Sequence, residues 1–431
     1  MSCLSIDPLI ELRFQHRRKL VMKKMVIGLV AAITMLSFVA ANGWAEKKEL
    51  DWDNPIKIGY VMPFTGVASL NTATDFPGIK LAVEEINAAG GVLGRPLKVI
   101  SRDSKLNAEH ALREVKDLVV NEKVFWVQGI ISSGVARAIS NYMKNMKKLF
   151  VIEVAKSEKL TGEWGNRYTF RATNNAYMEA VALAKASVKT FGPLKKLYNL
   201  SPDYEGGHSA WRTFFKSYKE LVPEAVLVGE AWPKLGNQDF TAYLTAIMNS
   251  DVELIFTAFY QTDAITMLKQ SIAIGLNGKI PMAGFWHANW EVVQKYNKDF
   301  YPKRTIGNGQ YAWWAIDTPS SNEFVEKIKS KYDVYPCYAV SGYSFVKAIA
   351  KAIEKAGSLD TEKVIDFLKG YQMPTPVGPI EIRACDHQVM WPTWVGLIEE
   401  LPGRTFFGTR NPMVISKEAY RTCEEISKLK K

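Results

Sequence analysis

Short apolar runs alternate along the chain with longer segments in which apolar and polar residues follow a helical period. In the first half, the apolar runs cover residues 56–61, 97–102, 125–129, 149–154 and 168–171. In the second half, they cover residues 196–200, 225–232, 254–258 and 280–284. Strands that alternate with helices in this way are typical of parallel α/β layers. The pattern therefore predicts an α/β protein with two doubly wound halves of similar size.

The segments between these runs have the apolar spacing of amphipathic helices. The predicted helices cover residues 78–89, 108–121, 134–146, 208–222, 240–249 and 262–274. Gly90 and Gly91 follow the first of them, where a left-handed residue often ends a helix. Asn107 stands where a side-chain cap begins the second.

The loops that follow the strands are the expected binding positions. In open parallel sheets, ligands bind beyond the carboxyl ends of the strands, where loops and helix N-termini expose unpaired backbone N–H groups. These loops cover residues 63–71, 130–134, 155–161, 201–207, 259–263 and 285–289. We therefore expect a ligand site to be built from them.

The first 45 residues have the features of a cleaved export signal. Basic residues precede an apolar run over residues 25–41, and small residues flank a cleavage point after Ala45. The polar stretch at the start favours translation from Met22 or Met25, with a long basic leader as the alternative. An uncleaved membrane anchor is the other interpretation, but Asn42 ends the run before the length of a typical membrane span.

The charge of the mature chain is basic but spread out. Removing residues 1–45 takes away six Lys/Arg and two Asp/Glu, so the net charge falls from +11 to +7 over 386 residues. Only Lys428, Lys430 and Lys431 form a tight cluster, whereas nucleic-acid binding requires a concentrated basic surface or a known module. We therefore expect no nucleic-acid partner. A hydrophobic content of 47% supports large cores, and no second apolar run is long enough to span a membrane.

Three cysteines follow the signal: Cys337, Cys385 and Cys423. An oxidising compartment permits one disulfide. We favour Cys385–Cys423, because both lie in the C-terminal segment, and the other two pairings stay open. Neither the cysteines nor the five histidines have metal-site spacing, so no metal or cofactor is expected.

No segment has the arrangement of a catalytic site. Asp386 and His387 follow Cys385, but neighbouring residues on a strand point to opposite faces, so this trio is interpreted as a structural turn. The glycines at residues 90–94 follow a helix instead of opening one, unlike a phosphate-binding loop. We therefore expect a binding protein and not an enzyme.

Eight segments stand in a shared order along nearly the whole mature chain. They are IGYVMPFTG, GIKLAVEEINAAGGVLGRPL, VQGIISSGVARAI, FVIEVAKSEKLTG, LSPDYEGGHSAWRTFFKSY, DFTAYLTAI, MLKQSIAIGL and GPIEIRACDHQ. In order and spacing, they resemble the branched-chain amino-acid-binding proteins of bacterial ABC transporters. The resemblance implies a type I periplasmic binding fold, in which two α/β lobes joined by three crossovers close on a solute.

The resemblance also implies a domain division and partners. One lobe would contain residues 46–173 and 316–387, and the other residues 174–315 and 388–431. The expected partners are a small-molecule ligand and an inner-membrane ABC permease, and the expected location and state are the periplasm and a monomer. A ligand-sensing module of a signalling receptor is the alternative, although such a module usually continues into a membrane span.

The resemblance places a carboxylate contact at Ser133, with Ser132 beside it. Relatives that bind leucine hold the α-carboxylate with a serine here, and hydroxyl and backbone N–H donors suit that group. The alternative is that both serines only cap the helix. Ala155 matches the loop after the fourth strand, where Lys156 replaces a hydroxyl residue. The Lys156 ammonium either pairs with an acidic ligand or points to solvent.

Tyr204 and Tyr260 match tyrosines that meet the ligand when the cleft closes, with core packing as the alternative. Asn71 and Leu70 match positions that shape the side-chain pocket.

Trp286 stands where amino-acid-binding relatives commonly carry a carboxylate for the ligand's ammonium group, and the next acid is Glu291. A buried ammonium without a charged partner costs several kcal/mol. Trp290 would add to an aromatic wall, and an amine would be held by π faces, Asp263 or Asp203. We expect an amino-acid ligand, with an aromatic or aliphatic carboxylic acid or an amide as the alternative.

Overall fold

The computed structural model describes Met22 and residues 50–430. The predicted export signal, apart from Met22, lies outside the described residues. Within the part of the chain that is described, no helix is both long enough and apolar enough to cross a membrane.

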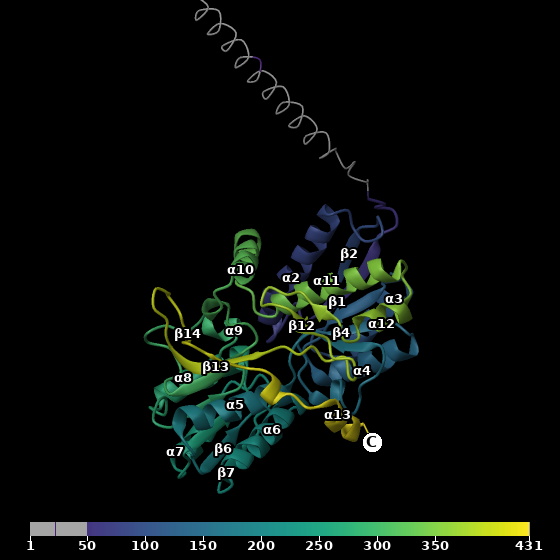
Figure 1. Cartoon of the computed structure of the whole chain (residues 1–431). Coiled ribbons are helices and arrows are strands. Elements are labelled where there is room, and N and C mark those ends of the chain that lie inside the picture. The colour runs from purple at the N-terminus through teal and green to yellow at the C-terminus, as the bar shows by residue number, and fades with distance from the viewer. Residues whose placement is uncertain (1–21, 23–49, 431) are drawn as a thin grey trace, which may run out of the picture. The chain divides into compact units, whose positions relative to one another are not determined.

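The first lobe is built on a five-stranded parallel sheet (Figure 1). Its strands are β1 (Ile56–Met62), β2 (Leu97–Asp103), β3 (Trp126–Gly129), β4 (Leu149–Ile152) and β5 (Thr169–Arg171). They lie in the order β2-β1-β3-β4-β5, and every neighbouring pair is parallel. These are the five strands that the apolar runs predicted, with ends that differ by at most two residues.

Helices cover both faces of this sheet. They are α2 (Ser69–Ala88), α3 (Ala108–Val120), α4 (Ser133–Asn145), α11 (Ala339–Ala356) and α12 (Thr361–Leu368), while α10 (Pro319–Tyr332) packs on α2. Successive strand side chains point to opposite faces. Tyr60 therefore packs in the same core as residues of α2 and α11, while the adjacent Val61 packs with residues of α3 and α4. Burial on both faces explains why β1, β3 and β4 appear in the sequence as continuous apolar runs, whereas the edge strand β2 is partly exposed.

Helix α2 begins at Ser69, so the prediction that it starts at residue 78 was wrong. Pro77 lies inside the helix, where proline removes a backbone donor and locally disfavours the helical conformation. The packing of α2 against α11 overrides this signal. Gly78 permits the close approach, since a Cβ at this position would overlap the carbonyl oxygen of Ala339. The extra turns place Asn71 and Thr74 on a helix instead of a loop.

The second lobe has a mixed sheet. Its strands are β6 (Lys196–Leu200), β7 (Val226–Ala231), β8 (Leu254–Thr257), β9 (Met282–Gly284), β10 (Thr305–Gly309), β13 (Thr393–Glu400), β14 (Phe407–Thr409) and β15 (Met413–Ile415). The order is β14-β13-β10-β9-β8-β6-β7, with β15 also paired to β13. Strands β6 to β10 are parallel, whereas β13, β14 and β15 form an antiparallel edge.

The helices of the second lobe are α5 (Ala176–Phe191), α6 (Glu205–Leu221), α7 (Thr241–Met248), α8 (Gln261–Ala273) and the short α9 (Trp290–Val293). Helices α5 and α6 pack side by side and share a core with β6 and β8. Helices α7 and α8 contribute to a different core, which continues into the first lobe.

The chain passes between the two sheets three times, as the resemblance implied. The passages lie between β5 and α5, between β10 and α10, and between β12 (Ile380–Glu381), which pairs with β11 (Gln372–Met373), and β13. Arg171 and Gln388 form a parallel bridge that joins the first and third passages. Trp391 Nε1 donates to the Gln310 carbonyl (3.0 Å), which joins the third passage to the second. The fold class is therefore confirmed, and the detailed lobe boundaries stay a prediction.

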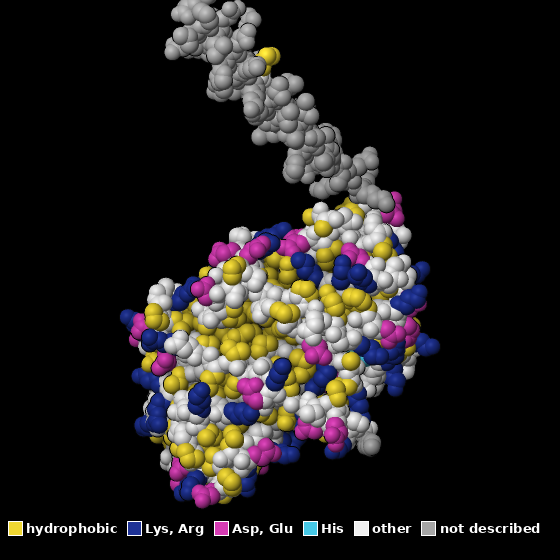
Figure 2. Space-filling view, viewed as in Figure 1, with side chains coloured by type: hydrophobic (Ala, Val, Ile, Leu, Met, Phe, Trp, Pro, Cys, Tyr) yellow, Lys and Arg dark blue, Asp and Glu magenta, His cyan; other side chains and the backbone are white. Residues whose placement is uncertain are grey.

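The C-terminal segment is held by the predicted disulfide. Cys385 and Cys423 are bonded, with their Cα atoms 6.0 Å apart, and Cys423 begins α13 (Cys423–Leu429). Asp386 accepts hydrogen bonds from Arg383 Nε (2.8 Å) and Nη2 (2.7 Å) within a turn, so the segment is structural, as expected. On the face drawn in Figure 2, basic and acidic side chains are interspersed.

Candidate functional site

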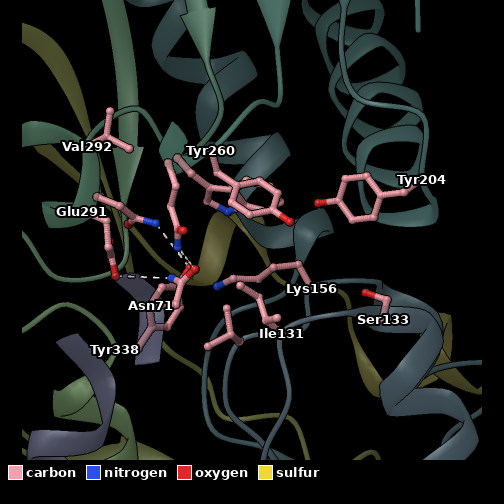
Figure 3. Close-up of a pocket in the computed structure, with 13 residues that line it drawn as sticks. Asn71, Ile131, Ser133, Lys156, Tyr204, Tyr260, Glu291, Val292 and Tyr338 are labelled. Carbon is pink, nitrogen blue, oxygen red and sulfur yellow. Dashed lines mark hydrogen bonds between the residues drawn. The ribbon is translucent and has the colours of Figure 1, made fainter. Parts of the chain in front are cut away.

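A narrow cavity lies between the two lobes (Figure 3). Its lining residues are Asn71, Ile131, Ser133, Val154, Lys156, Tyr204, Tyr260, Gln261, Trp286, Asn289, Glu291, Val292 and Tyr338. Most of them follow the carboxyl ends of β1, β3, β4, β6, β8 and β9, where open parallel sheets bind ligands. Tyr338 instead precedes α11, a helix that the apolar pattern did not locate.

Six of the eight predicted site residues line this cavity: Asn71, Ser133, Lys156, Tyr204, Tyr260 and Trp286. Ser132 and Ala155 do not. The Ala155 side chain is fully buried in the core that the sheet shares with α3 and α4. Ser132 is the N-cap residue of α4, and its side chain makes no capping hydrogen bond.

Ser133 is the first residue of α4 and is buried. Its hydroxyl oxygen accepts a hydrogen bond from the Ser157 backbone N–H (3.1 Å), which leaves the hydroxyl proton to donate elsewhere. The helix N-terminus carries partial positive charge. An anionic group in the cavity would therefore find a donor and a favourable field at this end.

Lys156 does not point to solvent, so that alternative was wrong. Its side chain is 4% exposed, and its ammonium donates to Glu179 Oε1 (2.9 Å), to the Asn174 backbone oxygen (3.2 Å) and side-chain Oδ1 (2.7 Å), and to Gln310 Oε1 (3.0 Å). Burial lowers the pKa of Lys156, and the neighbouring Glu179 carboxylate acts in the opposite direction. Asn174 and Gln310 belong to the first and second passages between the lobes, so the lysine is hydrogen-bonded to two of the three connections between the lobes.

Glu179 is a central residue that the sequence interpretation missed. It lies on α5, is fully buried, and accepts a hydrogen bond from Trp286 Nε1 (2.7 Å) as well as from Lys156. Burial raises the pKa of Glu179, while the Lys156 charge lowers it. One signal was available, because this is a lone acid in an otherwise apolar helical stretch, AYMEAVALA.

Trp286 is held in a restricted backbone conformation. Its φ is 65°, in the left-handed region that few non-glycine residues adopt, and its backbone N–H donates to Asn308 Oδ1 (2.9 Å). Its ring packs edge-on against Tyr260 (centroids 5.4 Å apart). Its side chain therefore supplies an aromatic wall and anchors Glu179 at the same time.

Tyr204 and Tyr260 approach each other across the cavity. Their ring centroids are 6.3 Å apart, and Figure 3 shows both hydroxyls directed to the space beside Lys156. Burial raises the pKa of each phenol, so both stay protonated hydrogen-bond donors at neutral pH. Both tyrosines precede helices, α6 and α8, and face the cavity from the second lobe.

Glu291 connects the two lobes through hydrogen bonds at the end of the cavity opposite Ser133. Its Oε1 accepts hydrogen bonds from Thr74 Oγ1 (2.6 Å) and Asn71 Nδ2 (3.3 Å), both on α2. Asn71 also bonds to Gln261 on α8. Contacts between α2 and the second-lobe helices α8 and α9 close the cleft, so the cavity is enclosed by both lobes.

No group of three or more His, Cys, Asp or Glu is positioned to hold a metal ion within Met22 and residues 50–430.

The sequence profile of the family described as "Periplasmic binding protein" matches residues 55–400. The chain is 24% identical over 340 residues to the leucine-, isoleucine-, valine-, threonine- and alanine-binding protein of Pseudomonas aeruginosa, covering 75% of this chain and 84% of that relative. It is 27% identical over 330 residues to Leu/Ile/Val-binding protein homolog 7 of Brucella abortus, covering 72% and 79%.

Two solved structures have the same fold and different ligands. A solute-binding protein of an ABC transporter from Rhodopseudomonas palustris HaA2, in complex with p-hydroxybenzoic acid, has a TM-score of 0.74 at 22% identity and covers 85% of this chain and 98% of its own. The branched-chain amino acid transporter substrate-binding protein of Streptococcus pneumoniae, in complex with isoleucine, has a TM-score of 0.72 at 22% identity and covers 84% and 100%.

Proposed function

This chain belongs to the periplasmic binding protein family, and we propose that it captures a small carboxylate-bearing solute between its lobes and delivers it to the permease of an ABC importer. The observation that carries the proposal is the cluster of hydroxyl donors at one end of the cavity. Ser133 faces it from the N-terminus of α4, and Tyr204 and Tyr260 face it from the second lobe. A carboxylate accepts several such hydrogen bonds at once.

The charges around the cavity favour a carboxylic acid with an apolar or flat body over a simple α-amino acid. An α-ammonium group would need an acid close to the carboxylate site. Glu179 is the buried acid next to Lys156 and Trp286, and it is already engaged by both. The walls formed by Ile131, Val154 and Trp286 suit an aromatic or aliphatic body.

A branched-chain amino acid is the second candidate. It is favoured by the relatives named for leucine, isoleucine and valine binding, which match about three quarters of the chain. Solved structures with the same fold hold either p-hydroxybenzoic acid or isoleucine, so the fold accommodates both classes.

Calorimetric titration of the purified, solute-free protein with leucine, benzoate and hexanoate tests the proposal. We expect at least one acid to bind, and a concentration of 100 times its Kd to stabilise the protein by about 2.7 kcal/mol. Ser133→Ala should weaken binding about tenfold, because a hydrogen bond to a charged group is lost.

Ser132→Ala is the matched control, since Ser132 lies next to Ser133 but outside the cavity lining. Its Kd should equal that of the unmodified protein. Equal effects of the two substitutions would contradict the carboxylate site, and chemical conversion of a bound acid would contradict the transport role.

A further inference from the structure

One oxygen of Glu291 is buried without a hydrogen-bond partner. The residue is 1% exposed and lines the cavity. Its Oε1 accepts from Thr74 and Asn71, but Oε2 has no hydrogen-bond partner within residues 50–430. The Cys337 thiol interacts with the same carboxyl group, and a thiol is only a weak donor. A cavity-lining carboxyl group therefore has one buried oxygen with no strong donor paired to it.

Glu291 and the proposed carboxylate site lie at opposite ends of the cavity. Figure 3 shows Ser133 on one side, Glu291 and Asn71 on the other, and Lys156 between them. The two ends also belong to different lobes, because Ser133 follows β3 and Glu291 follows β9. A solute that reaches both ends would touch both lobes.

We propose that Glu291 recognises a hydrogen-bond donor, an O–H or N–H group, at the end of the solute opposite its carboxylate. The inference rests on the proposed function, since Ser133 must hold the carboxylate for Glu291 to meet the far end. Buried polar groups are generally paired in native proteins. A solute with such a donor satisfies Oε2, whereas a solute without one leaves the oxygen unpaired.

Asn71 and Thr74 orient the carboxyl group for this role. Their two donors occupy Oε1, so the unpaired Oε2 is the oxygen left to accept from the solute. Both donors come from α2, and their bonds to α9 exist only when the lobes are together. Recognition of the far end of the solute is thereby coupled to closure.

Two matched pairs of acids test the inference on the full protein: 4-hydroxybenzoate against benzoate, and 6-aminohexanoate against hexanoate. A site built around a buried acceptor rejects a ligand that lacks the donor. We expect the donor-bearing acid of at least one pair to bind at least about tenfold more tightly. The first pair tests a hydroxyl donor and the second an ammonium donor.

Glu291→Gln is the diagnostic variant. The amide oxygen would still accept the hydrogen bonds from Thr74 and Asn71. The amide NH₂ would then take the place of Oε2 and present donors to the solute. The tenfold preference should disappear, while the Kd of the donor-free acid changes less than about threefold. Glu399→Gln, at an exposed position on β13, is the control, and urea unfolding confirms that both variants are folded.

The failures of the two proposals can be distinguished. Three outcomes would overturn the Glu291 inference and leave a carboxylate-binding transport protein. They are equal affinity within both pairs of acids, a preference that survives in Glu291→Gln, and tight binding of leucine when neither pair binds. Absence of binding by every carboxylate would overturn the proposed function itself.

Discussion

The ammonium of Lys156 lies 2.9 Å from the carboxylate of Glu179, and both side chains are buried. The lysine follows β4 of the first lobe, and the glutamate lies on α5 of the second. The pair therefore links the lobes directly behind the cavity. Its further bonds to Asn174, Gln310 and Trp286 connect it to two of the three passages and to the aromatic wall.

Removing the lysine alone should strongly destabilise the protein. Lys156→Met leaves Glu179 as a buried charge without its partner, and such a change typically costs about 3–5 kcal/mol. The double variant Lys156→Met/Glu179→Gln removes both charges and should recover part of this loss. Urea unfolding of the two single variants and the double variant measures the coupling. Strictly additive costs would show that the two charges do not depend on each other.

Trp286→Phe should reduce stability while keeping an aromatic wall. The change removes the Nε1 donor to Glu179 together with part of the ring, and hydrogen bonds to charged groups contribute about 1.5–3 kcal/mol. Trp290→Phe is the control, because the Trp290 indole N–H donates to no residue in the described range 50–430. Similar losses of unfolding free energy in both variants would indicate that packing and not the hydrogen bond is responsible.

The free energy of unfolding should fall as the pH rises from the ordinary pKa of Asp75 to its higher pKa in the folded protein. Burial raises the pKa of Asp75 from 3.8 to about 7, against the opposing effect of the hydrogen bond from Tyr60. Between these pH values the unfolded chain has lost the proton that the folded protein keeps, so the free energy of unfolding decreases with increasing pH.

Asp75→Asn should remove this dependence. Relative to the unmodified protein, the variant should be more stable at pH 8 than at pH 5 by about 1 kcal/mol or more. Urea unfolding at the two pH values measures the difference, and Asp51→Asn, at an exposed position, serves as the control. A constant difference between Asp75→Asn and the unmodified protein would rule out a titrating Asp75.

Reduction of the Cys385–Cys423 disulfide should lower the free energy of unfolding without changing the affinity for the ligand. The bond spans 38 residues, and chain entropy predicts a contribution of about 4 kcal/mol for a loop of that length. Neither cysteine lines the cavity, so the Kd should not change. In the double variant Cys385→Ser/Cys423→Ser, a reducing agent should cause no further loss of stability. A changed Kd would indicate that the C-terminal segment influences closure.

Tyr335 should affect ligand affinity from outside the cavity. It follows α10, stacks on Trp313 (centroids 4.3 Å apart), and packs edge-on against Trp290 on α9 of the second lobe (4.9 Å). Contacts between lobes favour the closed state and hence binding. Tyr335→Ala should weaken ligand binding several-fold, whereas Tyr243→Ala on α7 should not. Equal Kd values would show that this aromatic contact does not bias closure.

Several features could be predicted because they depend on local pattern. Strands β1 and β6 were located to within one residue, since burial on both faces makes a short continuous apolar run. The edge strands β14 and β15 are only three residues long, and no such run identified them. Helix α2 starts nine residues before the predicted position, and it continues through Pro77 because it packs against α11, a helix more than 260 residues away.

By itself, the sequence determined the α/β alternation and the order of the strands along the chain, because each follows from residues that are close together in the chain. The resemblance to a known family located six of the residues that line the cavity. Only the tertiary structure decided what those side chains do. Lys156 is engaged by Glu179, and Glu291 keeps one buried oxygen unpaired. The physical reason is that burial and pairing of a charge depend on residues brought together from different lobes, and these determine its energy.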